Sequence, residues 1–176
     1  TLSSPWMRSG ECSANRMTTI NIARRAFFRG RAVQIAHHVP WAVAAFEDAC
    51  RRCDECVQAC EEAILIIGDG GFPTVDFRRG ACTFCGACAA ACRYGALDNA
   101  VSPVWSIRFV ISDDCLSRRG IACRSCGESC PAAAIRFCLA IGGRAEPQLD
   151  PDSCTGCGAC VAVCPTDTIQ VHTEAA

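Results

Sequence analysis

The stretch Cys50-Arg51-Arg52-Cys53-Asp54-Glu55-Cys56-Val57-Gln58-Ala59-Cys60 places four thiols in eleven residues, separated by gaps of two, two and three residues. The same spacing returns in two further sets, at Cys82, Cys85, Cys88 and Cys92 and at Cys154, Cys157, Cys160 and Cys164. Cysteine accounts for 18 of 176 residues, a density at which covalent or metal cross-links usually replace part of a hydrophobic core. Three copies of one spacing predict metal-binding loops rather than unrelated thiols.

A fourth set has a longer first gap. Its members are Cys115, Cys123, Cys126 and Cys130. The inserted residues 116–122 include Arg118, Arg119 and Gly120, which suit a surface loop, and a longer loop can still return its thiolate to the same metal. Sixteen of the 18 cysteines therefore fall into four sets. Cys12 and Cys138 remain outside them, and we expect Cys138 to be a small buried thiol of a strand.

The regular spacing is the one by which bacterial ferredoxins hold [4Fe–4S] clusters. Three thiolates from one loop serve three iron atoms of a cubane, and the fourth iron needs a thiolate from elsewhere. In two-cluster proteins the fourth cysteine of each run ligates the other cluster. We therefore predict four clusters on crossed sets: Cys50, Cys53 and Cys56 with Cys92; Cys82, Cys85 and Cys88 with Cys60; Cys115, Cys123 and Cys126 with Cys164; and Cys154, Cys157 and Cys160 with Cys130.

Two other interpretations of the cysteines are weaker. Zinc sites pair two Cys-x2-Cys knuckles across roughly 12–20 residues, whereas three evenly spaced thiolates in one loop exceed what one tetrahedral ion needs. A disulfide framework would need a secretory context, and cysteines two residues apart rarely bridge each other. Iron–sulfur binding is therefore the favoured interpretation.

The repeat distances predict the domain organisation. Cys60 and Cys92 are 32 residues apart and Cys130 and Cys164 are 34 apart, whereas Cys92 and Cys130 are 38 apart. This pattern predicts two tandem two-cluster ferredoxin modules, at 50–104 and 105–176, behind a basic arm at 1–49.

The fold class predicted for the two modules is α+β. Short helices are expected to begin at the fourth cysteines, where Pro131 and Pro165 suit a first helical turn. The pairs Gly70-Gly71 and Gly142-Gly143 separate short apolar runs and predict small β-hairpins. Glycines inside the cysteine loops, such as Gly156 and Gly158, are expected to let the backbone approach inorganic sulfide.

Composition narrows the functional classes. The formal net charge of -1 provides no basic field for nucleic acid, and no run of about 18 apolar residues is present to cross a membrane. The sequence contains no nucleophile–base set, phosphate-binding glycine loop or dinucleotide fingerprint. We therefore expect an electron-transfer or assembly protein without a substrate site of its own.

From Met17 onward the chain resembles the NapF family, ferredoxin-type accessory proteins of the periplasmic nitrate reductase system. The resemblance rests on Arg24-Arg25-Ala26-Phe27-Phe28-Arg29-Gly30, on Pro40-Trp41, on Gly70-Gly71-Phe72-Pro73, on Trp105-Ser106-Ile107-Arg108-Phe109, and on Cys123-Arg124-Ser125-Cys126 closing the stretched set. It implies a cytoplasmic protein that acts on the molybdenum-containing catalytic subunit before that subunit is exported. The implied role is maturation, by cluster loading or redox poising; a general electron carrier or wiring subunit is the alternative.

The N-terminal arm combines charge with aromatic rings. Its candidate partner-binding residues are Arg24, Arg25, Phe27, Phe28 and Arg29. Exposed aromatic pairs beside cationic groups suit docking on another protein. The same residues also resemble a twin-arginine export signal, with Ala42-Val43-Ala44 as a conceivable cleavage site, and a solvated arm without a role is a third possibility.

Overall fold

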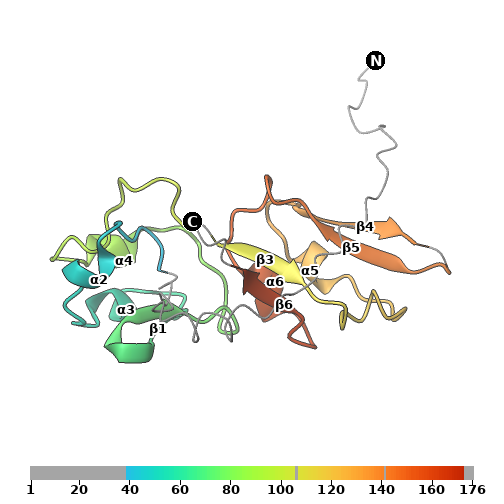
Figure 1. Ribbon diagram of the computed structural model, residues 1–176, viewed down its shortest axis with the longest axis horizontal. Helices are drawn as coiled ribbons and strands as arrows, with labels where there is room; N and C mark the ends of the chain where they lie inside the picture. Colours follow the sequence, from blue (N-terminus) through green and yellow to red (C-terminus); the bar gives the residue numbers. More distant parts are fainter. Residues whose placement is uncertain (1–38, 106, 141, 173–176) are drawn as a thin grey trace, which may run out of the picture. The chain divides into compact units, whose positions relative to one another are not determined.

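The computed structural model describes residues 39–105, 107–140 and 142–172 (Figure 1). The five candidate arm residues, Arg24, Arg25, Phe27, Phe28 and Arg29, lie outside this part, so their binding role stays a prediction. In the part of the chain that is described, no helix is long and apolar enough to cross a membrane. Short helices and two-stranded sheets make up the fold, as the α+β class predicts.

Residues 39–104, here called the first region, contain one of the expected hairpins. Strand β1 (Leu65–Ile67) pairs antiparallel with β2 (Pro73–Val75), and Leu65 lies opposite Val75. The turn between them is the short 3₁₀ helix η1 (Asp69–Gly71). Gly70 and Gly71 have φ angles of 65° and 78°, which only glycine adopts without strain. The hairpin predicted from this glycine pair is confirmed.

The first region also holds three short helices, α2 (Phe46–Ala49), α3 (Glu55–Gln58) and α4 (Ala87–Ala90). Its ends are held together, because the N–H of Trp41 donates to the carbonyl of Val104 at 2.8 Å and Ala42 forms a β-bridge with Leu97. Trp41 and Phe46 are buried in its hydrophobic core. Residues 39–49 thus pack with the ferredoxin-like region and do not extend from it as an arm.

The described residues of 105–172, here called the second region, contain four strands and two helices. Strand β4 (Ile135–Leu139) pairs antiparallel with β5 (Ala145–Leu149), which confirms the second expected hairpin. Strand β3 (Arg108–Ile111) pairs antiparallel with β6 (Ile169–His172), and the sequence did not predict this long-range pairing. The two helices are α5 (Ser125–Glu128) and α6 (Ala159–Ala162). The core of this region gathers Ile107, Phe109, Ile111, Ile135 and Ile169.

The expectation that helices begin at the fourth cysteines is wrong. Each cysteine set has a four-residue helix that contains its third cysteine and ends two residues before the fourth. The fourth cysteine instead opens a turn, in which the N–H of Ala63 donates to the carbonyl of Cys60 at 2.9 Å and that of Ala133 to Cys130 at 3.1 Å. Ala63 and Ala133 have φ angles of 51° and 49°, and this left-handed conformation cannot continue a right-handed helix.

Cys138 also differs from its expected environment. It lies on β4, where it is half-buried and disulfide-bonded, so the prediction of a buried free thiol is wrong.

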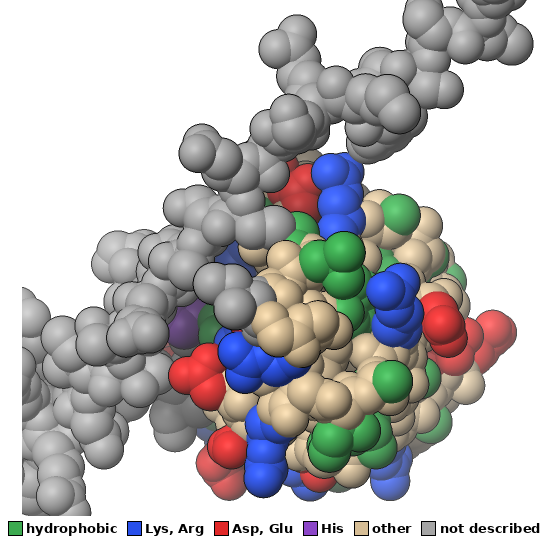
Figure 2. Space-filling view, turned by 90° about the vertical axis from the view of Figure 1, so that its right-hand side faces the viewer, with side chains coloured by type: hydrophobic (Ala, Val, Ile, Leu, Met, Phe, Trp, Pro, Cys, Tyr) green, Lys and Arg blue, Asp and Glu red, His purple; other side chains and the backbone are tan. Residues whose placement is uncertain are grey.

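On the face of the molecule drawn in Figure 2, arginine side chains are interspersed with acidic ones. Positive and negative side chains on that face therefore lie close together, and their electrostatic potentials largely cancel.

Candidate metal-cluster sites

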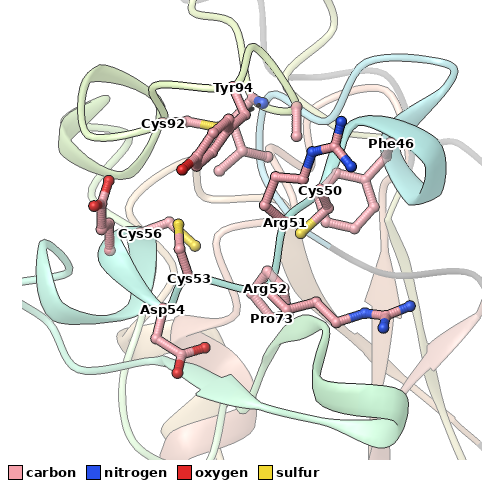
Figure 3. Close-up of a pocket in the computed structure, with 13 residues that line it drawn as sticks. Phe46, Cys50, Arg51, Arg52, Cys53, Asp54, Cys56, Pro73, Cys92 and Tyr94 are labelled. Carbon is pink, nitrogen blue, oxygen red and sulfur yellow. Dashed lines mark hydrogen bonds between the residues drawn. The ribbon is translucent and has the colours of Figure 1, made fainter.

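Four sulfur atoms surround one pocket in the first region. Cys50, Cys53, Cys56 and Cys92 line it, and it holds about 360 Å³ of empty space, part of which is open to solvent (Figure 3). The loop before α3 supplies Cys50 and Cys53, and α3 itself supplies Cys56. Cys92 comes from the second cysteine run, two residues after α4 ends. The pocket therefore combines three thiols of one run with the fourth thiol of the next.

A matching pocket lies in the second region and holds about 340 Å³ of empty space, part of which is open to solvent. It is lined by Cys115, Cys123, Cys126 and Cys164. The insertion after Cys115 is exposed at residues 119–122 but anchored at its start, where Ser117 is buried and its hydroxyl donates to the carbonyl of Ala145. Arg118 donates to the carbonyl of Ile111 at 2.7 Å. The insertion is thus a surface loop only in its second half, and its anchored half keeps Cys115 beside the pocket.

The remaining fourth cysteines also face the opposite run. Burial raises the pKa of Cys82, and the nearby thiols of Cys60 and Cys85 raise it further. Burial likewise raises the pKa of Cys154, with Cys130 and Cys157 as neighbouring thiols. The structure thus brings Cys60 beside the second run and Cys130 beside the last one. All sixteen thiols are free in the structure.

Burial makes ionisation of the third cysteine of each set unfavourable when no positive charge is present. Burial, followed by the thiols of Cys50 and Cys92, raises the pKa of Cys56 to about 11. Burial is also the main cause that raises the pKa of Cys126 to about 11 and those of Cys88 and Cys160 to about 12. Metal ligation needs thiolates, so a cationic iron core would supply the compensating charge and displace the protons.

The donor set at these pockets suits an iron–sulfur cluster. Four thiols line each pocket, and a donor set of four cysteines is the one that [4Fe–4S] clusters use.

Hydrogen bonds to the fourth cysteines were not foreseen from the sequence. The N–H of Leu97 donates to Cys92 Sγ at 3.4 Å, and the N–H of Ala134 donates to Cys130 Sγ at 3.3 Å. The hydroxyl of Thr168 lies 3.3 Å from Cys164 Sγ. Burial raises the pKa of Cys164, but hydrogen bonds from Thr168 and Thr166 outweigh it and the net pKa is lowered. Such bonds to sulfur also tune the reduction potential of a bound cluster.

Arg93 follows Cys92, at the position where the second region has proline after its fourth cysteines. Its guanidinium donates to both carboxylate oxygens of Glu55 on α3, with Nε at 3.0 Å from Oε2. This bond lowers the pKa of Glu55. The pair joins α3, which carries Cys56, to the segment that carries Cys92. Arg93 and Glu55 therefore hold together two segments that line one pocket.

Two protein families match the chain at these sites. The 4Fe-4S dicluster domain matches residues 49–96, and the 4Fe-4S binding domain matches residues 147–170. The fold, the all-cysteine pockets and these matches define the protein as an iron–sulfur protein of the ferredoxin class, which binds [4Fe–4S] clusters and transfers electrons.

The particular family follows from the similar proteins. Ferredoxin-type protein NapF of Escherichia coli (strain K12) is 39% identical over 157 residues, which cover 87% of this chain and 96% of that protein. Ferredoxin-type protein NapF of Haemophilus influenzae is 41% identical over 170 residues, covering 89% and 97%. Ferredoxin-type protein NapG of Escherichia coli (strain K12) is 33% identical over 141 residues, covering 68% and 61%. The chain belongs to the NapF family of ferredoxin-type proteins.

Proposed function

We propose that the protein holds four [4Fe–4S] clusters, one on each crossed set of cysteines, in two tandem two-cluster modules. The observation that carries the proposal is that Cys92 and Cys164 line the same pockets as three cysteines of another run. When bound, the clusters accept and release single electrons. The chain's own residues ligate them, donate hydrogen bonds to the fourth sulfur atoms and bury the third cysteines against the hydrophobic cores.

Anaerobically prepared protein is expected to contain about 16 iron and 16 acid-labile sulfide per chain, because each of the four sets holds one cubane. Iron analysis, sulfide analysis and the brown absorption would measure this. A reproducible value near 12 would remove one set, with the stretched set at Cys115 as the first suspect. Zinc at one ion per set, without the absorption, would contradict the proposal.

We further propose that the protein acts in the cytoplasm in maturation of the catalytic, molybdenum-containing subunit of periplasmic nitrate reductase, before that subunit is exported. Membership in the NapF family supports this role. The protein would load iron–sulfur clusters into the subunit or set their redox state, and it would have no substrate site of its own. A general electron carrier would use the same ligands but would form no stable complex with the immature subunit.

The arm tests the partner proposal. Replacement of Arg24, Arg25, Phe27 and Phe28 by alanine is expected to weaken binding to the immature catalytic subunit by about tenfold or more, because arginine and aromatic side chains dominate many interfaces. Pull-down with the purified subunit at several salt concentrations would measure the loss, and binding of the parent chain should weaken as salt rises. Iron content should be unchanged.

The matched control is the double variant Arg8→Ala and Arg16→Ala, which removes two positive charges outside the region of family resemblance. It should bind like the parent. Undiminished binding and normal enzyme maturation with the quadruple variant would contradict a docking role for the arm. If the parent protein is instead recovered from the periplasm and its arm has been cleaved off, the export alternative is supported.

A further inference from the structure

The four cysteine sets differ in where they lie within each region. The inner sets are Cys60 with Cys82, Cys85 and Cys88, and Cys130 with Cys154, Cys157 and Cys160. The outer sets are Cys50, Cys53, Cys56 and Cys92, and Cys115, Cys123, Cys126 and Cys164. We infer that the two inner sets meet where the two regions join, so that the four sets form one series with the outer sets at its ends. This inference rests on the proposed ligand sets.

A direct backbone hydrogen bond joins the two inner sets. The N–H of Cys82 donates to the carbonyl of Cys157 at 2.8 Å. Each of these residues is a proposed ligand, and they belong to different regions. Because the peptide groups of two proposed ligand residues are in direct contact, no other residue lies between the two inner sets at this point.

Trp105 connects the same two loops through its side chain. Its indole Nε1–H donates to the carbonyl of Thr155, between Cys154 and Cys157, at 3.3 Å. Its ring also lies edge-on to Phe84, two residues after Cys82, with 5.9 Å between the ring centroids. A cross-region contact through one rigid aromatic residue fixes the distance between the two loops.

Phe77 fills the remaining space at this junction. A Cβ atom at Gly158 would lie 1.9 Å from Phe77 Cδ1, so the ring is packed directly on the loop that follows Cys157. Gly158 has a φ of +82°, which independently favours glycine. The Phe77 ring is 5.4 Å from that of Phe109, centroid to centroid. Phe77 follows β2 of the first region, yet it is buried in the core of the second region.

The order within each region completes the series. Helix α3, which carries Cys56, packs against α4, which carries Cys88. Helix α5, with Cys126, packs in the same way against α6, with Cys160. Each outer set therefore neighbours the inner set of its own region. An electron that crosses the whole protein enters at one outer set and leaves at the other, which assigns two separate docking ends to its redox partners.

Two variants with four substitutions each would test the series by electron paramagnetic resonance of the reduced protein. The inner-pair variant keeps both inner sets and loses both outer sets through Cys53→Ser, Cys56→Ser, Cys123→Ser and Cys126→Ser. The outer-pair variant keeps both outer sets and loses both inner sets through Cys85→Ser, Cys88→Ser, Cys157→Ser and Cys160→Ser. Each is expected to keep about eight iron. The inner-pair spectrum should show splitting from spin–spin coupling across the junction, and the outer-pair spectrum should show two signals without such splitting.

The outcomes separate the inference from the proposed function. Eight iron with an unsplit inner-pair spectrum, or with a split outer-pair spectrum, would overturn the series while leaving the ligand sets intact. An iron content far from eight would contradict the ligand sets. Hydrogen exchange on the unmodified, fully loaded chain then decides the series independently of the cysteine variants.

In that measurement the amide of Cys82 should be protected, because its hydrogen bond crosses the junction. The variant Phe77→Leu should speed its exchange about tenfold or more, since the substitution loosens the packing on Gly158. The control Phe137→Leu, which changes a ring packed on Gly127 in the second region, should leave it unchanged. Rapid exchange of Cys82 in the parent would overturn the inference.

Discussion

Removal of iron by a chelator in the presence of an oxidant is expected to unfold most of the described structure. Every α-helix in the described residues has four residues, far below the roughly 12–15 that an isolated helix needs in water. The sheets have two strands each, and such hairpins are marginal by themselves. Structural metal sites in small domains contribute on the order of 10 kcal/mol to folding.

Far-ultraviolet circular dichroism and the fluorescence of Trp41 and Trp105 would follow the loss. Both indoles lie against the cores, so both should become exposed to water when iron leaves. Reconstitution with iron and sulfide should restore the spectrum. Chelator without oxidant is the control and should leave the protein folded. A cooperative thermal transition that persists in the iron-free chain would show that the hydrophobic cores suffice.

Replacement of Cys92 by serine is expected to remove the cluster whose other ligands are Cys50, Cys53 and Cys56, leaving about 12 iron. The iron content of this single variant does not identify which cluster is lost, but two double variants do identify it. With crossed ligands, Cys92→Ser with Cys53→Ser damages one cluster and leaves about 12 iron, whereas Cys92→Ser with Cys85→Ser damages two and leaves about eight. Ligation within each run predicts the reverse.

The control is Cys138→Ser, which breaks the disulfide of a cysteine outside the four sets and should keep about 16 iron. If the variant with Cys53→Ser contains eight iron and that with Cys85→Ser contains 12, the crossed assignment is refuted for the first region. Equal values in both double variants would mean that serine replaces cysteine as a ligand at one of these positions.

The hairpins were predictable because the local sequence determines them. A glycine pair between short apolar runs fixes both the turn and the strands beside it, as at Gly70-Gly71 and Gly142-Gly143. The positions of Cys92 and Cys164 beside the opposite runs agree with the spacing read by the rule for two-cluster ferredoxins, and their ligation of clusters stays a prediction. In both cases the decisive residues are close in sequence or repeat at a fixed distance.

The helix positions and the junction were not predictable for the opposite reason. Ala63 and Ala133 adopt left-handed φ angles that their side chains do not favour, so the surrounding fold imposes the turn. Gly156 and Gly158 were expected to make room for sulfide, but they face Trp105 and Phe77. The residues in these contacts are 51 and 81 positions apart, and no local sequence pattern predicts such a pairing. The pairing of β3 with β6 could not be predicted for the same reason.

The joined ends of the first region have a consequence for biosynthesis. Backbone hydrogen bonds join Trp41 to Val104 and Asp98, and Ala42 forms a β-bridge with Leu97. This region therefore cannot close until translation has passed residue 104. The second region closes later still, when β6 emerges to pair with β3. A nascent chain that ends between the first and second cysteine runs has exposed thiols at Cys50, Cys53 and Cys56, because Cys92 has not yet been synthesised. Closure therefore follows the ribosome in two steps, and Phe77 and the Cys82 amide of the first region find their partners only in the second step.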